Sequence, residues 1–191
     1  MKVALSVVSG LLILLALGLY ILAIRRGETK PAKASWVIWA TLDTIILAGM
    51  LASGTVSGQM IGAVVGIWIV VAFSLKYGES GWTSFDKLCL GGAVLGIILW
   101  AAFKSPALGV LASASTLFLG GIPTFVSAWK NPRGEDRLAW IIFWVSALCA
   151  LLAVPSWTIA DAAAPIVFFA IESIVMVIVL VRPRSCPPKA R

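Results

Sequence analysis

Asp43 and Glu172 are the side chains best placed to do chemistry, because each lies near the middle of a long apolar stretch. A charge at the centre of a bilayer costs ~3 kcal/mol or more, so such residues usually face a bundle interior or a water-filled cavity. A carboxyl in such a place can exchange a proton or hydrogen-bond a polar solute. The alternative is a neutral acid that binds a neighbouring helix and serves packing alone. The sequence leaves both interpretations open.

Three further residues are candidates for a pocket or a moving part. Gln59 opens an apolar stretch and either caps a helix end or hydrogen-bonds a substrate. Pro123 falls inside an apolar stretch, where proline removes one helix hydrogen bond and bends the helix. That bend is either a hinge in a transport cycle or a static kink. Trp144 lies deeper than most tryptophans of the chain and either packs or lines a path.

Several classes of enzyme are excluded by what the chain lacks. It has no histidine, which removes imidazole zinc sites, histidine-ligated haem and Ser-His or Cys-His catalytic pairs. Its cysteines, Cys89, Cys149 and Cys186, form no CxxC pattern, as metal sites of that kind require. The sequence therefore predicts a protein that is not an enzyme and has neither a cofactor nor a bound metal.

The elements that must position these residues are hydrophobic helices. The chain has 191 residues, of which 61% are apolar and 12% charged, and its mean hydropathy is +1.04. A membrane-spanning helix needs about 17–25 mostly apolar residues. Seven stretches qualify, at residues 3–24, 35–53, 57–75, 87–103, 106–129, 138–154 and 163–181. We therefore predict an all-α integral membrane protein with seven transmembrane helices.

The basic residues predict how the chain is oriented. Thirteen of the fifteen lysines and arginines lie in the first, third and fifth loops and the tail, and only Lys2 and Lys104 lie on the other side. Cytoplasmic loops carry the excess of such residues. The N-terminus is thus expected outside and the C-terminus in the cytoplasm, in a multi-pass protein of a cell membrane of the bacterial inner-membrane type. The net charge of +7 is then an orientation signal and does not indicate a nucleic-acid partner.

The nine tryptophans also bear on the membrane. Tryptophan is enriched at the two membrane–water interfaces. We expect such interfacial positions for the six tryptophans nearest the ends of the stretches, which are Trp36, Trp39, Trp82, Trp129, Trp140 and Trp157.

The first and last three helices follow the same plan. Trp36 aligns with Trp140 at a shift of 104 residues, and Gly18 with Gly121 at a shift of 103. Each set has a helix, a basic loop, a tryptophan-led helix, a short turn without basic residues and a third helix. Such repeats are typical of transporters. We predict two parallel three-helix-bundle repeats, residues 1–76 and 106–182, joined by a loop and linker helix at 77–105 and followed by a cytoplasmic tail at 183–191.

Short motifs accompany this plan. They are Leu119-Gly120-Gly121-Ile122-Pro123-Thr124, then Ala128-Trp129-Lys130 with the loop Asn131 to Asp136, and Gly58-Gln59-Met60-Ile61-Gly62 leading to Lys76-Tyr77-Gly78. The chain resembles the SWEET and PQ-loop transporter superfamily in these stretches and in its arrangement of three, one and three helices. In PQ-loop proteins a Pro-Gln pair stands where this chain has Pro123 and Thr124, and Tyr20 stands at the first equivalent place.

The resemblance implies two bundles that rock around a central site. It does not imply a sugar as substrate, because Asn131 is the chain's sole asparagine and the family's sugar-binding asparagines lie in the third and seventh helices. We therefore expect a small polytopic transporter of a small polar solute, with or without proton coupling.

The alternative is a seven-helix membrane protein without transport activity, acting as a subunit or assembly factor. The expected partners are the lipid bilayer and the solute. A homo-oligomer is possible through the small-residue row Gly92-Gly96, because such rows let helices approach closely.

Overall fold

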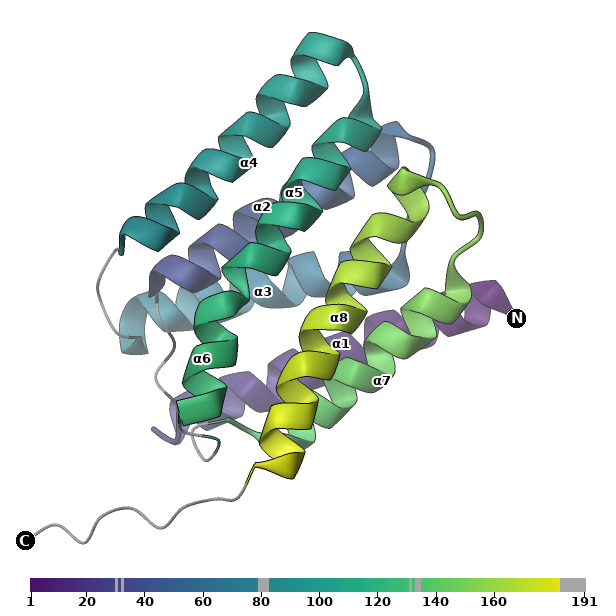
Figure 1. Cartoon of the computed structure of the whole chain (residues 1–191). Coiled ribbons are helices and arrows are strands. Elements are labelled where there is room, and N and C mark those ends of the chain that lie inside the picture. The colour runs from purple at the N-terminus through teal and green to yellow at the C-terminus, as the bar shows by residue number, and fades with distance from the viewer. Residues whose placement is uncertain (30, 32, 79–82, 131, 133–134, 183–191) are drawn as a thin grey trace, which may run out of the picture.

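The protein is built from helices. The computed structural model describes residues 1–29, 31, 33–78, 83–130, 132 and 135–182, and within these ranges it has eight helical segments and no strand (Figure 1). The segments are α1 (Lys2–Arg25), α2 (Lys33–Ala52), α3 (Gly58–Tyr77), α4 (Ser84–Phe103), α5 (Pro106–Gly120), α6 (Ile122–Lys130), α7 (Arg137–Ala153) and α8 (Ile159–Val181). The predicted tail at 183–191 lies outside the described residues.

Side-chain caps explain why two helices begin earlier than predicted. Thr83 accepts a hydrogen bond from the Asp86 backbone and Asp86 reaches back to Thr83, a capping box that starts α4 at Ser84. Thr158 accepts one from the Asp161 backbone and starts α8 at Ile159. Such caps satisfy backbone donors that a helix terminus leaves without partners. The apolar pattern could not locate them because the cap residues are polar.

The fifth predicted span is bent into two segments. α5 ends at Gly120, and α6 begins directly after Gly121. Pro123 has no backbone N–H to offer the carbonyl of Leu119, four residues earlier, so the helical ladder is interrupted at this point. The predicted interruption near Pro123 is present, and it falls two residues before the proline.

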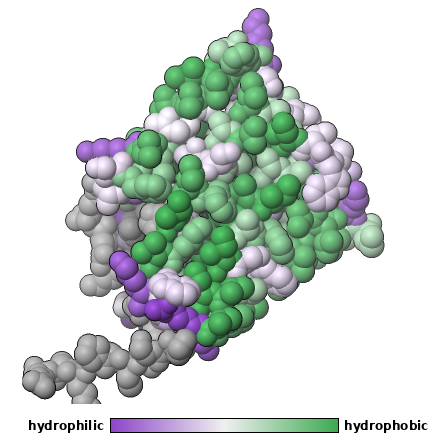
Figure 2. Space-filling view, in the orientation of Figure 1, coloured by the Kyte–Doolittle hydropathy of each residue, from purple (hydrophilic) through white to green (hydrophobic). Residues whose placement is uncertain are grey.

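Five segments are long and apolar enough to cross a membrane, namely α1, α3, α4, the bent segment Pro106–Lys130 and α8. Apolar residues 36–52 of α2 and the whole of α7 form shorter helices. Figure 2 shows hydrophobic residues over most of the visible face and hydrophilic ones at its margins. The prediction of an all-helical protein with several potential membrane spans is confirmed, and the number seven stays a prediction.

For description, the helices of the first predicted repeat, α1–α3, are called the first group, and those of the second, α5–α8, the second group. α3 contacts both α1 and α2, and α8 contacts α5, α6 and α7. The groups meet where α1 packs on α7 and where α2 packs on α5. Helix α4 lies at the edge, against α5 and to a lesser extent α2 (Figure 1).

The bundle has two distinct ends. At one end Arg25, Lys76, Lys130 and Arg182 terminate or follow their helices, and we call this the basic end. At the other end, here called the opposite end, the Lys2 ammonium donates to the Val154 carbonyl at 2.9 Å. Short connections join α2 to α3 and α4 to α5 at this opposite end. The helices therefore run alternately up and down.

Candidate functional site

Asp43 lies in the middle of α2 and is only 2% exposed. Its neighbours Leu42 and Ile46 belong to an apolar cluster that also contains Val110 of α5 and Ala164 of α8. The carboxyl oxygen Oδ1 is buried and has no hydrogen-bond partner. Burying a polar atom in this way is costly unless a partner such as water or a ligand is supplied.

Glu172 lies in α8 and is 4% exposed. Its oxygen Oε2 is likewise buried without a hydrogen-bond partner. α2 and α8 contact each other. The two acids that the sequence singled out therefore lie on neighbouring helices, one from each group.

Two neutral polar side chains are also buried without partners. Both the amide nitrogen and the amide oxygen of Gln59 lack a hydrogen bond, although the residue is fully buried near the start of α3. The expected capping role of Gln59 has no hydrogen bond to support it in this structure. Ser113 of α5 is fully buried too, facing Gly96 of α4, and its hydroxyl has no partner.

The remaining predicted residues are Trp144 in α7 and Pro123 in α6. Trp144 donates its indole N–H to the Ser173 hydroxyl at 2.9 Å and packs its ring near Phe169, with centroids 5.8 Å apart. This contact fastens α7 to α8. Pro123 lies in α6, and its side chain is outside the described part of the structure.

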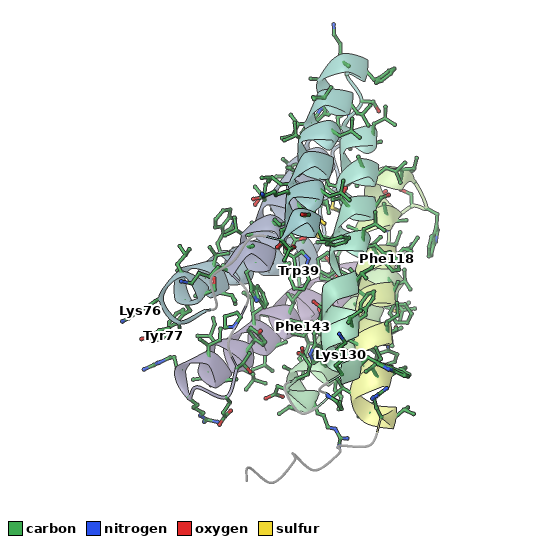
Figure 3. The ribbon with its side chains drawn as sticks, turned by 60° about the vertical axis from the view of Figure 1, so that its left-hand side comes forward. Trp39, Lys76, Tyr77, Phe118, Lys130 and Phe143 are labelled. Carbon is green, nitrogen blue, oxygen red and sulfur yellow. The ribbon has the colours of Figure 1, made fainter. Side chains whose placement is uncertain are left out.

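An aromatic cluster occupies the centre of the molecule toward the basic end. Trp36 of α2 and Phe143 of α7 are each 9% exposed, and the partly buried Tyr20, Trp39, Trp140 and Phe168 pack against the same cluster. Figure 3 labels Trp39 and Phe143 near the middle of the bundle. Trp36, Trp39 and Trp140 pack between helices in this cluster, and their position at the membrane interface stays a prediction.

Neighbouring rings of this cluster are in contact in two sets. The centroids of Tyr20 and Trp36 are 4.9 Å apart, and those of Trp36 and Trp39 are 5.5 Å apart. The centroids of Trp140 and Phe143 are also 5.5 Å apart. The indole N–H of Trp39 faces Gly120 at the bend between α5 and α6, where any larger residue would crowd it.

Glu135 adds a carboxylate to the edge of the aromatic cluster. It precedes α7 and accepts a hydrogen bond from the Trp140 indole at 2.9 Å. Burial raises the pKa of the Glu135 carboxyl above its usual range, and the hydrogen bond from Trp140 partly opposes that shift. Glu135 is not among the residues predicted from the sequence, and the signal that could have found it is Trp140, five positions later.

No three His, Cys, Asp or Glu side chains gather into a possible metal site within the described ranges. The arrangement offers hydrogen-bonding acids and aromatic faces, which are groups that bind solutes by charge and stacking. Comparison with protein-family models, curated proteins and solved structures finds no match to this chain.

Proposed function

We propose that the protein is a small membrane transporter of a small polar solute, and that Asp43 and Glu172 contribute to its central site. The observation that carries this proposal is the burial of these two carboxyls, each with an oxygen that has no partner, where the two helix groups meet. If the two acids served packing alone, these oxygens would stay buried without a hydrogen bond, and no nearby group would offset the free-energy cost of that burial. A passing solute, a proton or water would supply the missing partner.

The packing pattern supports a repeat of three helices. If α1, α2 and α3 are matched with the bent segment α5–α6, α7 and α8, the contact of α1 with α7 corresponds to that of α5 with α2. The contacts of α3 with its two neighbours correspond to those of α8 with α5 and α7. α4 has no counterpart in this match, which is what we expect of a linker helix between two repeats.

The aromatic residues are consistent with the same match. The shift of 104 residues that aligns Trp36 with Trp140 also aligns Trp39 with Phe143, and both pairs have ring centroids 5.5 Å apart. This supports the likeness to the SWEET and PQ-loop plan. In that account the basic end is cytoplasmic, because thirteen of the fifteen basic residues belong to it or to the tail, and the two groups rock about the central acids.

Uptake into vesicles tests this proposal. The purified protein is reconstituted and supplied with a panel of radiolabelled amines, amino acids and sugars. The wild type is expected to accumulate or exchange at least one of them, and Asp43→Asn and Glu172→Gln to lose most of that flux. Asp161→Asn is the matched control, since this acid binds Ser156 and Thr158 at the opposite end.

The alternative function is a non-transporting subunit or assembly factor. In that case both acids serve packing, and the variants at positions 43 and 172 would leave all fluxes at the background of empty vesicles, like the wild type. A flux that persists unchanged in both variants would contradict the proposed role of the acids.

A further inference from the structure

The aromatic cluster and Glu135 together have the chemistry of a site for a small organic cation. The faces of aromatic rings attract cations, tryptophan most strongly, and cages of such rings recognise quaternary ammonium groups. Tyr20 and Trp36 are adjacent, as are Trp140 and Phe143, and these pairs come from helices of both groups. A carboxylate beside such rings adds a full opposite charge.

Glu135 is positioned to provide that charge. Its Oε2 accepts a hydrogen bond from the Trp140 indole nitrogen at 2.9 Å. Arg137, two residues along the chain, and Arg182, at the basic end, have other contacts. The Arg137 side chain donates to the Val179 carbonyl at 3.1 Å, and the Arg182 guanidinium lies over the Trp129 ring at 4.1 Å.

The cluster is only partly buried. α2 and α7 contribute most of the rings, yet these helices are not among the closely packed pairs. The side chains of Tyr20, Trp39 and Trp140 remain partly exposed although they lie between helices. Deeper in the bundle, Asp43 and Glu172 add two further carboxyls.

We propose that Tyr20, Trp36, Trp39, Trp140 and Phe143, with Glu135, bind a small organic cation of the alkylammonium class. The inference rests on the proposed function only in taking this cation as the transported solute. Binding itself is independent of transport, and the two are tested separately.

The test is equilibrium dialysis of the whole purified chain with radiolabelled choline, in maltoside micelles free of choline headgroups. The competitor is 3,3-dimethyl-1-butanol, which has the shape of choline but no charge. Choline is expected to bind saturably, and the neutral isostere is expected not to displace it. Displacement by the isostere at the concentrations that unlabelled choline needs would overturn the proposal, as would the absence of saturable binding.

Two variants locate the site. Glu135→Gln is expected to weaken choline binding about tenfold or more, the loss of one close opposite charge. Glu28→Gln removes the same charge from an exposed position at the same end and is expected to bind like the wild type. Unchanged binding in Glu135→Gln would contradict the site. If that variant does not fold, Trp140→Phe keeps a ring but loses the indole N–H, and unchanged binding there has the same meaning.

The outcomes separate the two proposals. Choline that binds as described but does not enter vesicles would leave the cation site standing and count against transport. A flux of another solute without choline binding would support transport and count against the cation site.

Discussion

α1 and the bent segment α5–α6 hold corresponding places in the proposed repeat, and they are built in opposite ways. α1 is unbroken over 24 residues and is pressed against α3 through glycines. A Cβ added to Gly62 would meet the Gly10 carbonyl oxygen at 2.6 Å, and one added to Gly58 would meet the Ser6 carbonyl. The other segment is interrupted at Gly121 beside the aromatic cluster. In the first group, α1 and α3 are therefore an unbroken and closely packed pair of helices, here called the rigid side. The second group contains the interruption at Gly121, here called the joint.

The contact of α1 with α7 also belongs to the rigid side. Ser9 donates its hydroxyl to the Ser146 carbonyl at 2.8 Å, and Ser146 donates to the Ser9 carbonyl at 2.9 Å. Both serines are fully buried. The contact between the two groups is thus held by reciprocal hydrogen bonds on the α1 side. The α2–α5 side instead relies on close packing of Gly49 against Val110.

The largest expected effect is that of Gly62→Ala, which breaks the rigid side. The new methyl would collide with backbone of α1 and with Ile13, so we expect a loss of ~2–3 kcal/mol in the free energy of unfolding. Thermal unfolding followed by circular dichroism in detergent measures it. Gly18→Ala, in α1 with open space around it, is the control and should unfold like the wild type. Equal stability of the two variants would contradict the close α1–α3 contact.

A smaller effect is expected from the serine pair. Hydrogen bonds between membrane helices contribute about 0.6 kcal/mol on average and up to about 1.7 kcal/mol. Ser9→Ala and Ser146→Ala should each cost about 1 kcal/mol, and the double variant about the sum of the two, because each hydroxyl donates to a backbone carbonyl that alanine keeps. Single variants as stable as the wild type would contradict these two hydrogen bonds.

Pro123→Ala probes the joint in α5–α6. Alanine restores the N–H that the Leu119 carbonyl lacks, so we expect the two segments to join into one helix. Spin labels at the exposed positions Leu111 and Val126 report this change. Their separation should lengthen toward the ~22 Å that 15 residues span in a straight helix. An unchanged distance would assign the bend to packing around Gly121 instead of to the proline.

The smallest effect concerns the pH dependence of stability. Burial raises the pKa of Glu135 above its ordinary 4.5, so the folded protein retains the proton over a window that begins near that value and extends upward. The unfolded chain binds fewer protons in this window, and the unfolding free energy therefore falls as the pH rises through it. Glu135→Gln should have a flatter profile above pH 4.5 than Glu28→Gln does. Parallel profiles would show that Glu135 is solvated.

The helical architecture was predictable because the lengths of the apolar stretches and the positions of the basic loops can be seen directly in the sequence. Asp43 and Glu172 could be singled out because each is an acidic residue inside an apolar stretch. Packing was harder to predict. Trp36, Trp39 and Trp140 lie near helix ends in sequence, and only the three-dimensional arrangement turns them inward. The Ser9–Ser146 pair had no signal, since a small hydroxyl inside a hydrophobic helix looks the same whether or not it meets a partner 137 residues away.

The central claim is that Asp43 and Glu172 lie on a path that water can reach. The most direct measurement is the modification of Asp43→Cys and Glu172→Cys, each in a cysteine-free background, by a membrane-impermeant cationic thiosulfonate added at the basic end. Ser146→Cys, in the sealed α1–α7 contact, is the matched control. We predict that positions 43 and 172 react and position 146 does not. If the cysteines at positions 43 and 172 react as little as the one at position 146, the result would contradict the account and favour a solid, non-transporting bundle.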